Sequence, residues 1–329
     1  MNGIKDGFNA AFTYLKQNGI IPLFAILYIA TSLFFPTFFT GETQGNLFRM
    51  ASINGLLAVG LTYVIIAGNI DISVGSVMAW SCCVVGWMTN ANMAFLGIIL
   101  ALLSGLFFGF IMSVMIVELK MPPFIASLAI LQSVRGLVFV TTDYQQIAIR
   151  GMPDWLRFIG RGQYLNVITT PAAIFIVLVL ITSYILRRTN IGSSIYAVGG
   201  NREAAKMMGL KVDRTLYFAH MTCSACAALA GVVLTARMGA VSSVTGEMAE
   251  MQAIAATVLG GTMLTGGVGK ISGTFFGVMF MATLTSMFNM MSGVNTFWQF
   301  VITGVLLLIV VLSQSISQNS AFLKASNKA

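Results

Sequence analysis

The chain has 329 residues, of which 57% are hydrophobic and only 9% charged, and its mean hydropathy is +0.88. A typical soluble domain carries about 25% charged residues, so this composition excludes an ordinary soluble fold. The net charge of +8 is spread over the ends of apolar runs and is not gathered in one basic patch, which excludes nucleic acid as the expected partner.

Apolar runs long enough to cross a bilayer, about 17–25 residues, recur from Ile20 to Leu312. Segments within the hydrocarbon must be helices, because unpaired backbone groups are too costly there. We therefore predict an all-α polytopic membrane protein with about ten transmembrane helices, some of them broken by glycine. The predicted spans are residues 20–40, 50–67, 75–90, 93–118, 122–141, 168–186, 215–236, 250–263, 271–290 and 296–314.

The basic residues predict how these spans are threaded. The N-terminal segment 1–19, the loop 187–214 and the tail 315–329 are all basic, and even numbers of spans, six and four, separate them. With all three in the cytoplasm, 12 Lys and Arg lie on the cytoplasmic side and 5 outside, as the positive-inside rule requires. We therefore predict one membrane domain, 20–314, with both termini cytoplasmic and with 142–167 as an external loop.

Two glycine-broken segments resemble one another. "VIIAGNIDISVGSV" has Gly68 and Gly75 seven residues apart, and "TVLGGTMLTGGVGK" has Gly260 and Gly267 at the same spacing. Broken helices in matching halves often line a transport path. Glycine is also common where transmembrane helices pack closely, so packing is the alternative interpretation.

Three charged residues lie at predicted membrane depth. Asp71 stands between two spans, and an acidic residue there is either functional or, with Ser73 beside it, the cap of the next helix. Glu250 stands where it could cap a helix at its positive end. Arg135 lies inside a predicted span, so we expect it to face an acid, a carbonyl group or water.

The external loop 142–167 mixes aromatic residues with Arg150, Arg157 and Arg161. This composition is typical of the membrane–water interface. It is equally enriched at protein contact surfaces, so the three arginines are candidates for docking an external protein.

The loop segment "GGNREAAKMMGLKVDR" holds four basic and two acidic side chains in an otherwise apolar chain. Asn201 is a good N-cap and Gly209 can end a helix in the left-handed conformation, which predicts a short helix between them. About seven helical residues are too few to be stable alone in water. The helix must therefore lie against lipid headgroups or dock a cytoplasmic partner.

No catalytic or metal site emerges from the sequence. His220 is the only histidine, Cys223 and Cys226 lack a second pair of ligands, and the segment around Lys270 does not match a phosphate-binding loop. We therefore expect no enzyme, no metal and no nucleotide cofactor in this chain.

Four stretches together resemble the ribose/galactose/xylose-type permeases of ATP-binding cassette sugar importers, in the branched-chain permease superfamily. They are "GNIDISVGSV", "PPFIASLAILQSVRGL", "GGNREAAKMMGLKV" and "EMQAIAATVLGGTMLTGGVGKISGT", in matching order along nearly the whole chain. "EAAKMMG" is similar to the E-A-A-x-x-x-G loop of such permeases. The Ile-x-Leu-Pro that follows this loop in many importers is absent here.

This resemblance implies a bacterial inner-membrane permease, a homodimer in lipid, that imports a pentose or hexose delivered by a periplasmic binding protein. ATP and magnesium would bind a separate cytoplasmic ATPase. The coupling helix for that ATPase would comprise Glu203, Ala204, Ala205, Met207, Met208 and Gly209. Candidate residues of the translocation path are Asp71, Ser73, Gly75, Phe124, Arg135, Glu250, Gly260 and Gly261. The alternative is a secondary transporter or channel with Asp71 and Glu250 as ion-coupling sites.

Overall fold

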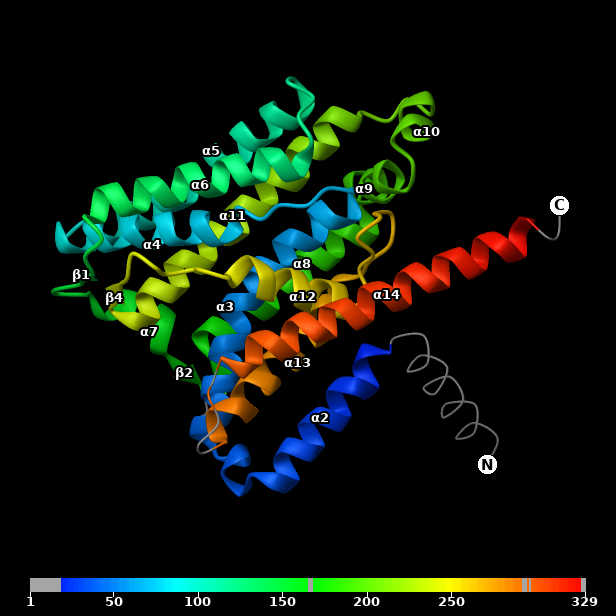
Figure 1. Cartoon of the computed structure of the whole chain (residues 1–329). Helices are drawn as coiled ribbons and strands as arrows, with labels where there is room; N and C mark the ends of the chain where they lie inside the picture. The colour runs from blue at the N-terminus through cyan, green and yellow to red at the C-terminus, as the bar shows by residue number, and fades with distance from the viewer. Residues whose placement is uncertain (1–18, 165–167, 292–294, 296, 327–329) are drawn as a thin grey trace.

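The structure is a computed structural model that describes residues 19–164, 168–291, 295 and 297–326 (Figure 1). Helices dominate it, in agreement with the predicted all-α class. In chain order the helices are α2 (Ile20–Phe34), the 3-10 helix η1 (Pro36–Phe39), α3 (Gly41–Ile66), α4 (Val74–Asn90), α5 (Ala94–Val117), α6 (Pro123–Thr142), α7 (Asp154–Arg161), α8 (Thr170–Arg188), α9 (Asn190–Gly200), α10 (Arg202–Met207), α11 (Val212–Met238), α12 (Ala249–Leu259), α13 (Ile271–Met290) and α14 (Trp298–Ser326).

The described residues also contain four two-residue strands, which the sequence did not predict. β1 (Ile147–Ala148) pairs antiparallel with β4 (Ala240–Val241), and β2 (Gln163–Tyr164) pairs with β3 (Ile168–Thr169). They lie beside α7 at one end of the molecule (Figure 1). The predicted external loop 142–167 is therefore a small ordered structure, of which residues 165–167 lie outside the described part.

Each of the ten predicted spans contains a helix. Among the described residues, six helices are long and apolar enough to cross a membrane: α3, α5, α6, α8, α11 and α13. The helices α2 and α12 have 15 and 11 residues, and the apolar part of α14 is Trp298–Leu312. The structure thus supports a multi-pass membrane protein, while ten spans remain a prediction.

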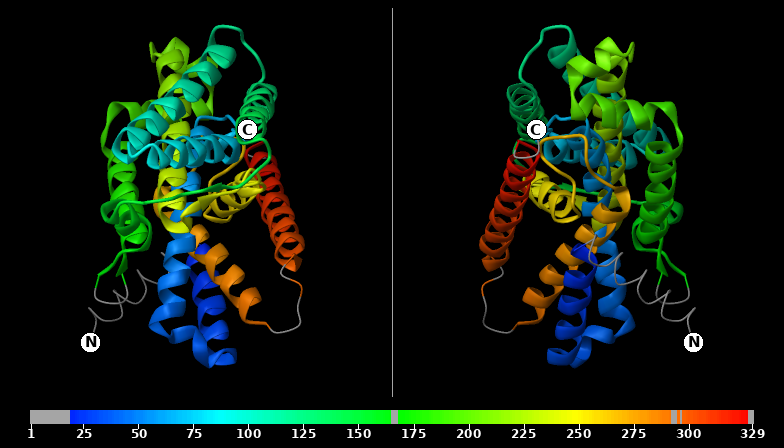
Figure 2. Two further views of the ribbon diagram at one scale, coloured as in Figure 1. Left: turned by 90° about the vertical axis from the view of Figure 1, so that its left-hand side faces the viewer. Right: turned by 90° about the vertical axis from the view of Figure 1, so that its right-hand side faces the viewer.

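The two polar loops lie at opposite ends of the molecule. The loop with α9 and α10 is at the end where α14 finishes, and α7 with the short strands is at the other end (Figure 1). Figure 2 shows the molecule from the left-hand and the right-hand side of that view. The charge pattern predicts that these loops lie on opposite sides of a membrane, and that threading stays a prediction. Two details differ from the prediction: α9 was missed, and α14 continues through the predicted tail to Ser326. Most of the N-terminal segment 1–19 lies outside the described residues.

The helices α3 and α11 form the centre of the bundle. Nearly every side chain from Gly55 to Ile66 in α3 is buried, and the Tyr63 hydroxyl donates a 2.7 Å hydrogen bond to the carbonyl oxygen of Thr182 in α8. Glycines allow close packing against α11: a Cβ on Gly60 would lie 2.9 Å from the Cα of Cys223. Small residues at helix interfaces are typical of membrane bundles, because they let backbones approach.

Candidate functional site

The helix α10 has the predicted start and stop. The Asn201 side chain accepts a 2.9 Å hydrogen bond from the backbone N–H of Ala204, which satisfies one of the free donors at the start of the helix. Gly209 has φ +78° and ends the helix in the left-handed region, which glycine adopts without strain. The short capped helix predicted from the sequence is therefore confirmed, whereas its coupling role stays a prediction.

The side chains of α10 divide between an exposed and a buried face. Met207 and Met208 are 82% and 68% exposed, and Glu203 is exposed as well. Ala205 is fully buried within the chain, and Ala204 is half-buried. This corrects the expectation that Ala205 faces a partner: its methyl group packs α10 onto the body of the protein, and the methionines form the open surface.

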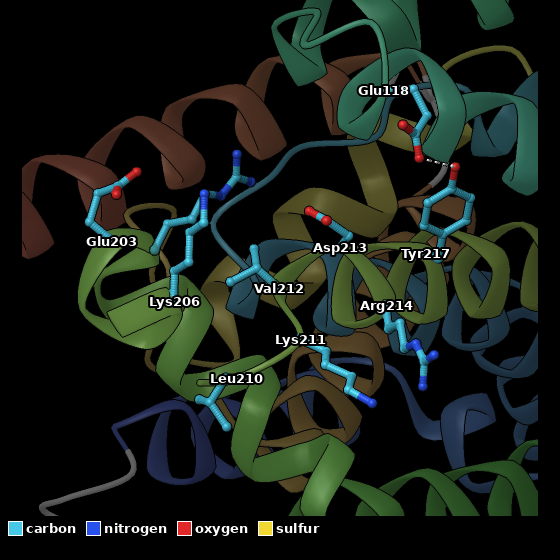
Figure 3. Close-up of a pocket in the computed structure, with 10 residues that line it drawn as sticks. Glu118, Glu203, Lys206, Leu210, Lys211, Val212, Asp213, Arg214 and Tyr217 are labelled. Carbon is cyan, nitrogen blue, oxygen red and sulfur yellow. Dashed lines mark hydrogen bonds between the residues drawn. The ribbon is translucent and has the colours of Figure 1, made fainter. Parts of the chain in front are cut away.

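A groove of about 520 Å³ lies next to α10 (Figure 3). On one side are Glu203 and Lys206 of α10, and on the other the Tyr217 hydroxyl donates a 3.3 Å hydrogen bond to Glu118 at the end of α5. Charged side chains of both signs dominate the lining. The lining residues are Glu118, Arg202, Glu203, Lys206, Leu210, Lys211, Val212, Asp213, Arg214 and Tyr217. Such a mixed surface suits docking of a protein with its own charges of both signs.

Glycines join this loop to the two glycine-broken segments of the sequence. The N–H of Gly267 donates a 2.8 Å hydrogen bond to the carbonyl oxygen of Ile66, at the end of α3. A Cβ on Gly199, at the end of α9, would overlap that same carbonyl oxygen. A Cβ on Gly266 would come within 2.8 Å of the Cα of Gly68. Three chain segments therefore meet backbone to backbone, which only glycine permits.

Tyr196 of α9 strengthens this junction. Its hydroxyl donates a 2.8 Å hydrogen bond to the carbonyl oxygen of Gly269. A tyrosine hydroxyl is protonated at physiological pH even without burial, and burial raises the pKa of Tyr196 further. The loop that carries α10 is thus held by side chain and backbone to the turn between α12 and α13.

Asp71 is fully buried in a non-helical segment, residues 67–73, that joins α3 to α4. Its Oδ1 accepts hydrogen bonds from the backbone N–H of Ser73 at 2.8 Å and from the Ser73 hydroxyl at 2.6 Å. Its Oδ2 lies 3.9 Å from Nδ1 of His220, which is also fully buried. Asp71 therefore organises the turn into α4, although no side chain caps the first turn of that helix, and it also faces a second ionisable group.

His220 is the residue that sequence reasoning missed. The sequence around His220 offers no acidic partner, so it was assigned no role. Its partners, Asp71 and Asn69, lie about 150 positions away and reach it only through the packing of the 67–73 segment on α11. The presence of a single histidine at membrane depth was the available signal, since such polar residues are usually functional or paired.

Other predicted path residues form a second group near the start of α12. Arg135 is buried, and its guanidinium donates to the carbonyl oxygens of Thr245 at 2.6 Å and Ser243 at 3.4 Å. Of the three expected kinds of partner, an acid, a carbonyl group or water, the structure shows carbonyl groups. A Cβ on Gly75 would collide with the Glu250 carboxylate, so Gly75 leaves room for this acid beside α4.

The remaining candidates are not brought together. Gly260 packs against the backbone of Gly273, and Gly261 takes φ +88° in the turn after α12. Phe124 is 53% exposed on α6, and no described contact joins it to Asp71. The buried cluster around Asp71 is therefore separate from the turn at Gly260 and Gly261 and from the exposed ring of Phe124.

The three arginines of the external loop have different roles. Arg161 donates from Nε to the carbonyl oxygen of Arg237 at 2.6 Å and from Nη2 to that of Met238 at 3.1 Å. It therefore caps the end of α11. Arg157 pairs with exposed Asp154 at 3.2 Å, and Arg150 is exposed. Arg161 is thus committed to the end of α11, while the docking role of the three arginines stays a prediction.

Comparison with known proteins identifies relatives over most of the chain. Residues 44–311 match the family described as "Branched-chain amino acid transport system / permease component". The chain is 40% identical over 288 residues to the ribose import permease protein RbsC of Bacillus subtilis, covering 87% of this chain and 89% of that protein. It is 33% identical over 304 residues to RbsC of Escherichia coli K12, covering 91% and 93%. It is 32% identical over 321 residues to the fructose import permease protein FruG of Bifidobacterium longum, covering 94% and 93%. No solved structure matches the chain.

Proposed function

Because the chain belongs to the branched-chain amino acid transport permease family, we propose that it is the membrane-spanning subunit of an ATP-driven importer of a monosaccharide. Its relatives are named as import permeases for ribose and for fructose, so a pentose or hexose is the substrate class and ribose the first sugar to test. The observation that carries the proposal is α10, a capped helix at one end of the bundle that exposes two adjacent methionines.

In this proposal the end with α10 is cytoplasmic and contacts an ATPase subunit that binds ATP and magnesium. Met207 and Met208 supply flexible apolar contacts, and the groove beside them supplies charges of both signs. Glu203 and Gly209 complete the exposed surface. A displacement of α10 by the ATPase would be transmitted through the glycine junction to α3 and to the turn before α13.

The opposite end would then face the periplasm and receive a sugar-loaded binding protein, with Arg150 and Arg157 contributing to docking. The exposed apolar side chains of α5 and α6, among them Phe107 and Val140, would be covered by lipid and by a second copy of the chain in a homodimer. The chain would lie in the bacterial inner membrane. The path residues Asp71, Ser73, Gly75, Arg135 and Glu250 would act by supporting the helices around the path.

Assembly tests this proposal. The permease is co-expressed with the ATPase and the binding protein of the same organism and purified in detergent. We expect the ATPase to co-purify, and ribose-loaded binding protein to raise ATP hydrolysis in lipid nanodiscs. A permease that retains no ATPase, but carries an ion with the sugar through Asp71 and Glu250, would instead be a secondary transporter.

A further inference from the structure

Asn69 forms hydrogen bonds with two side chains from different parts of the chain. It lies in the non-helical segment 67–73 and is only 3% exposed. Its Oδ1 accepts a 3.3 Å hydrogen bond from Arg202, the first residue of α10. Its Nδ2 lies 3.0 Å from Nε2 of His220 in α11. One buried amide therefore bridges α10 and the centre of the bundle.

The chemistry of these groups fixes the direction of every hydrogen bond. Arginine can only donate, so the oxygen of the Asn69 amide must face Arg202 and its NH₂ group must face His220. Nε2 of His220 then accepts, and the ring proton is on Nδ1. Nδ1 lies 3.9 Å from Oδ2 of Asp71, and neither atom has a hydrogen-bond partner. The donors thus form a series that starts at α10 and points to a buried carboxylate.

We propose that Asn69 and His220 are positioning residues that transmit the position of α10 to the Asp71 segment. While Arg202 holds the Asn69 amide, His220 keeps the tautomer that directs Nδ1–H at Asp71. A movement of α10 that withdraws Arg202 releases the amide, and the histidine is no longer held in this tautomer. The turn into α4 that Asp71 organises then loses its facing donor. This inference rests on the proposed function.

The backbone contacts are consistent with this transmission. Gly199 and Gly266 hold the start of the α10 loop against Gly68, one residue from Asn69. The segment 67–73 therefore contacts the loop of α10 through its backbone at Gly68 and through the side chain of Asn69. A coupling free energy needs such a pair of elements whose contacts differ between two states.

The tautomer can be measured directly, because His220 is the only histidine in the chain. The permease is labelled with ¹⁵N-histidine, purified through a tag without histidine, and its imidazole nitrogens are observed by NMR. We expect a protonated Nδ1 and an unprotonated Nε2. In Arg202→Ala the two tautomers should mix. In Arg188→Ala, a matched removal of an exposed cation at the same end, the spectrum should stay unchanged.

A protonated Nε2 in the wild-type protein would overturn the inference. An unchanged spectrum in Arg202→Ala would overturn it as well. Because Arg202 is exposed, its truncation leaves the core intact. The test therefore holds even where substitution of the buried Asn69 prevents folding.

A second experiment measures coupling in the reconstituted importer, as ribose transported per ATP hydrolysed. We expect Asn69→Leu and Arg202→Ala each to lower this ratio about tenfold while ATP hydrolysis continues. The double variant should be no worse than the more affected single variant, because both remove the same connection. His220→Gln should retain most of the ratio, since its amide can accept from Asn69 and donate towards Asp71.

The outcomes separate this inference from the proposed function. Wild-type uptake that needs no ATP would refute the proposed function itself. ATP-driven uptake with a full transport ratio in both Asn69→Leu and Arg202→Ala would overturn the inference alone. If Asn69, Arg202 and His220 have a purely structural role, their substitutions should lower the melting temperature and the transport ratio together. His220→Gln should then lower both quantities as well.

Discussion

The amide N–H of Gly267 donates a 2.8 Å hydrogen bond to the carbonyl oxygen of Ile66, and Gly199 packs against the same oxygen. Because a Cβ on Gly199 would overlap this oxygen, Gly199→Ala must push the loop of α10 away from α3. We expect a loss of about 1–3 kcal/mol in stability, as for other overpacked sites. Thermal unfolding of the purified permease in detergent measures it.

Gly200→Ala is the matched control for this substitution. A Cβ on Gly200 meets no atom within 4 Å, and alanine favours the helical conformation at the end of α9. Its melting temperature should therefore equal or slightly exceed that of the wild type. An equal loss in Gly199→Ala and Gly200→Ala would show that the junction carries no special packing.

The exposed methionines of α10 should determine retention of the ATPase. Met207→Ser with Met208→Ser removes the apolar surface but leaves the caps at Asn201 and Gly209 in place. We expect normal membrane insertion and melting temperature with less ATPase on co-purification. Met93→Ser, which changes another exposed methionine in the turn between α4 and α5, should retain the full amount of ATPase. Full retention in the double variant would exclude these side chains from the contact.

Ala205→Glu should behave differently from the methionine substitutions. The carboxylate would enter a fully buried position without a described partner, which is costly. We therefore expect a lower melting temperature of the permease alone, before any partner is added. An unchanged melting temperature would mean that Ala205 is open to a partner after all.

Among the external arginines, we expect some to affect stability and others to affect binding. Arg161→Gln removes the donors that cap α11, and we expect the melting temperature to fall by about 2–4 °C. Arg150→Glu with Arg157→Glu should leave the melting temperature unchanged but weaken the affinity for the sugar-loaded binding protein, more strongly at low salt. Equal affinity at low salt would remove these two residues from the docking surface.

Local signals in the sequence predicted the local structure well. The helix over Arg202–Met207 with its caps follows from Asn201 and Gly209. The cost of a cation in a membrane predicted a polar partner for Arg135, and the structure shows that the partner is a pair of carbonyl groups. The strands at Ile147 and Val241 could not be foreseen, because two residues carry no periodicity and their partners are remote in sequence.

The cluster of Asp71, Asn69 and His220 likewise depends on contacts that the sequence could not predict. Asp71 was found because a lone acid at membrane depth is conspicuous. His220 and Asn69 were not assigned roles, since the contact between them depends on how the 67–73 segment packs against α11. The repeated glycine spacing, Gly68 with Gly75 and Gly260 with Gly267, was visible as a pattern, but only the fold shows that Gly68 and Gly267 meet at Gly199.

The two substitutions of Asp71 test its proposed part in the transport cycle. Asp71→Asn keeps an oxygen that accepts from Ser73, so the turn into α4 should form and uptake should fall only in part. Asp71→Leu leaves those donors unpaired, and we expect much lower uptake together with a lower melting temperature. Equal uptake in the two variants would show that the hydrogen bonds to Ser73 do not matter for transport.

The energy source of uptake tests the central claim most directly. The permease, the ATPase and the binding protein are reconstituted in vesicles, and uptake of labelled ribose is measured with ionophores that collapse proton and sodium gradients. The account predicts that uptake requires ATP on the side of α10 and is unaffected by the ionophores. Uptake that continues without ATP, and stops when an ion gradient is collapsed, would contradict it.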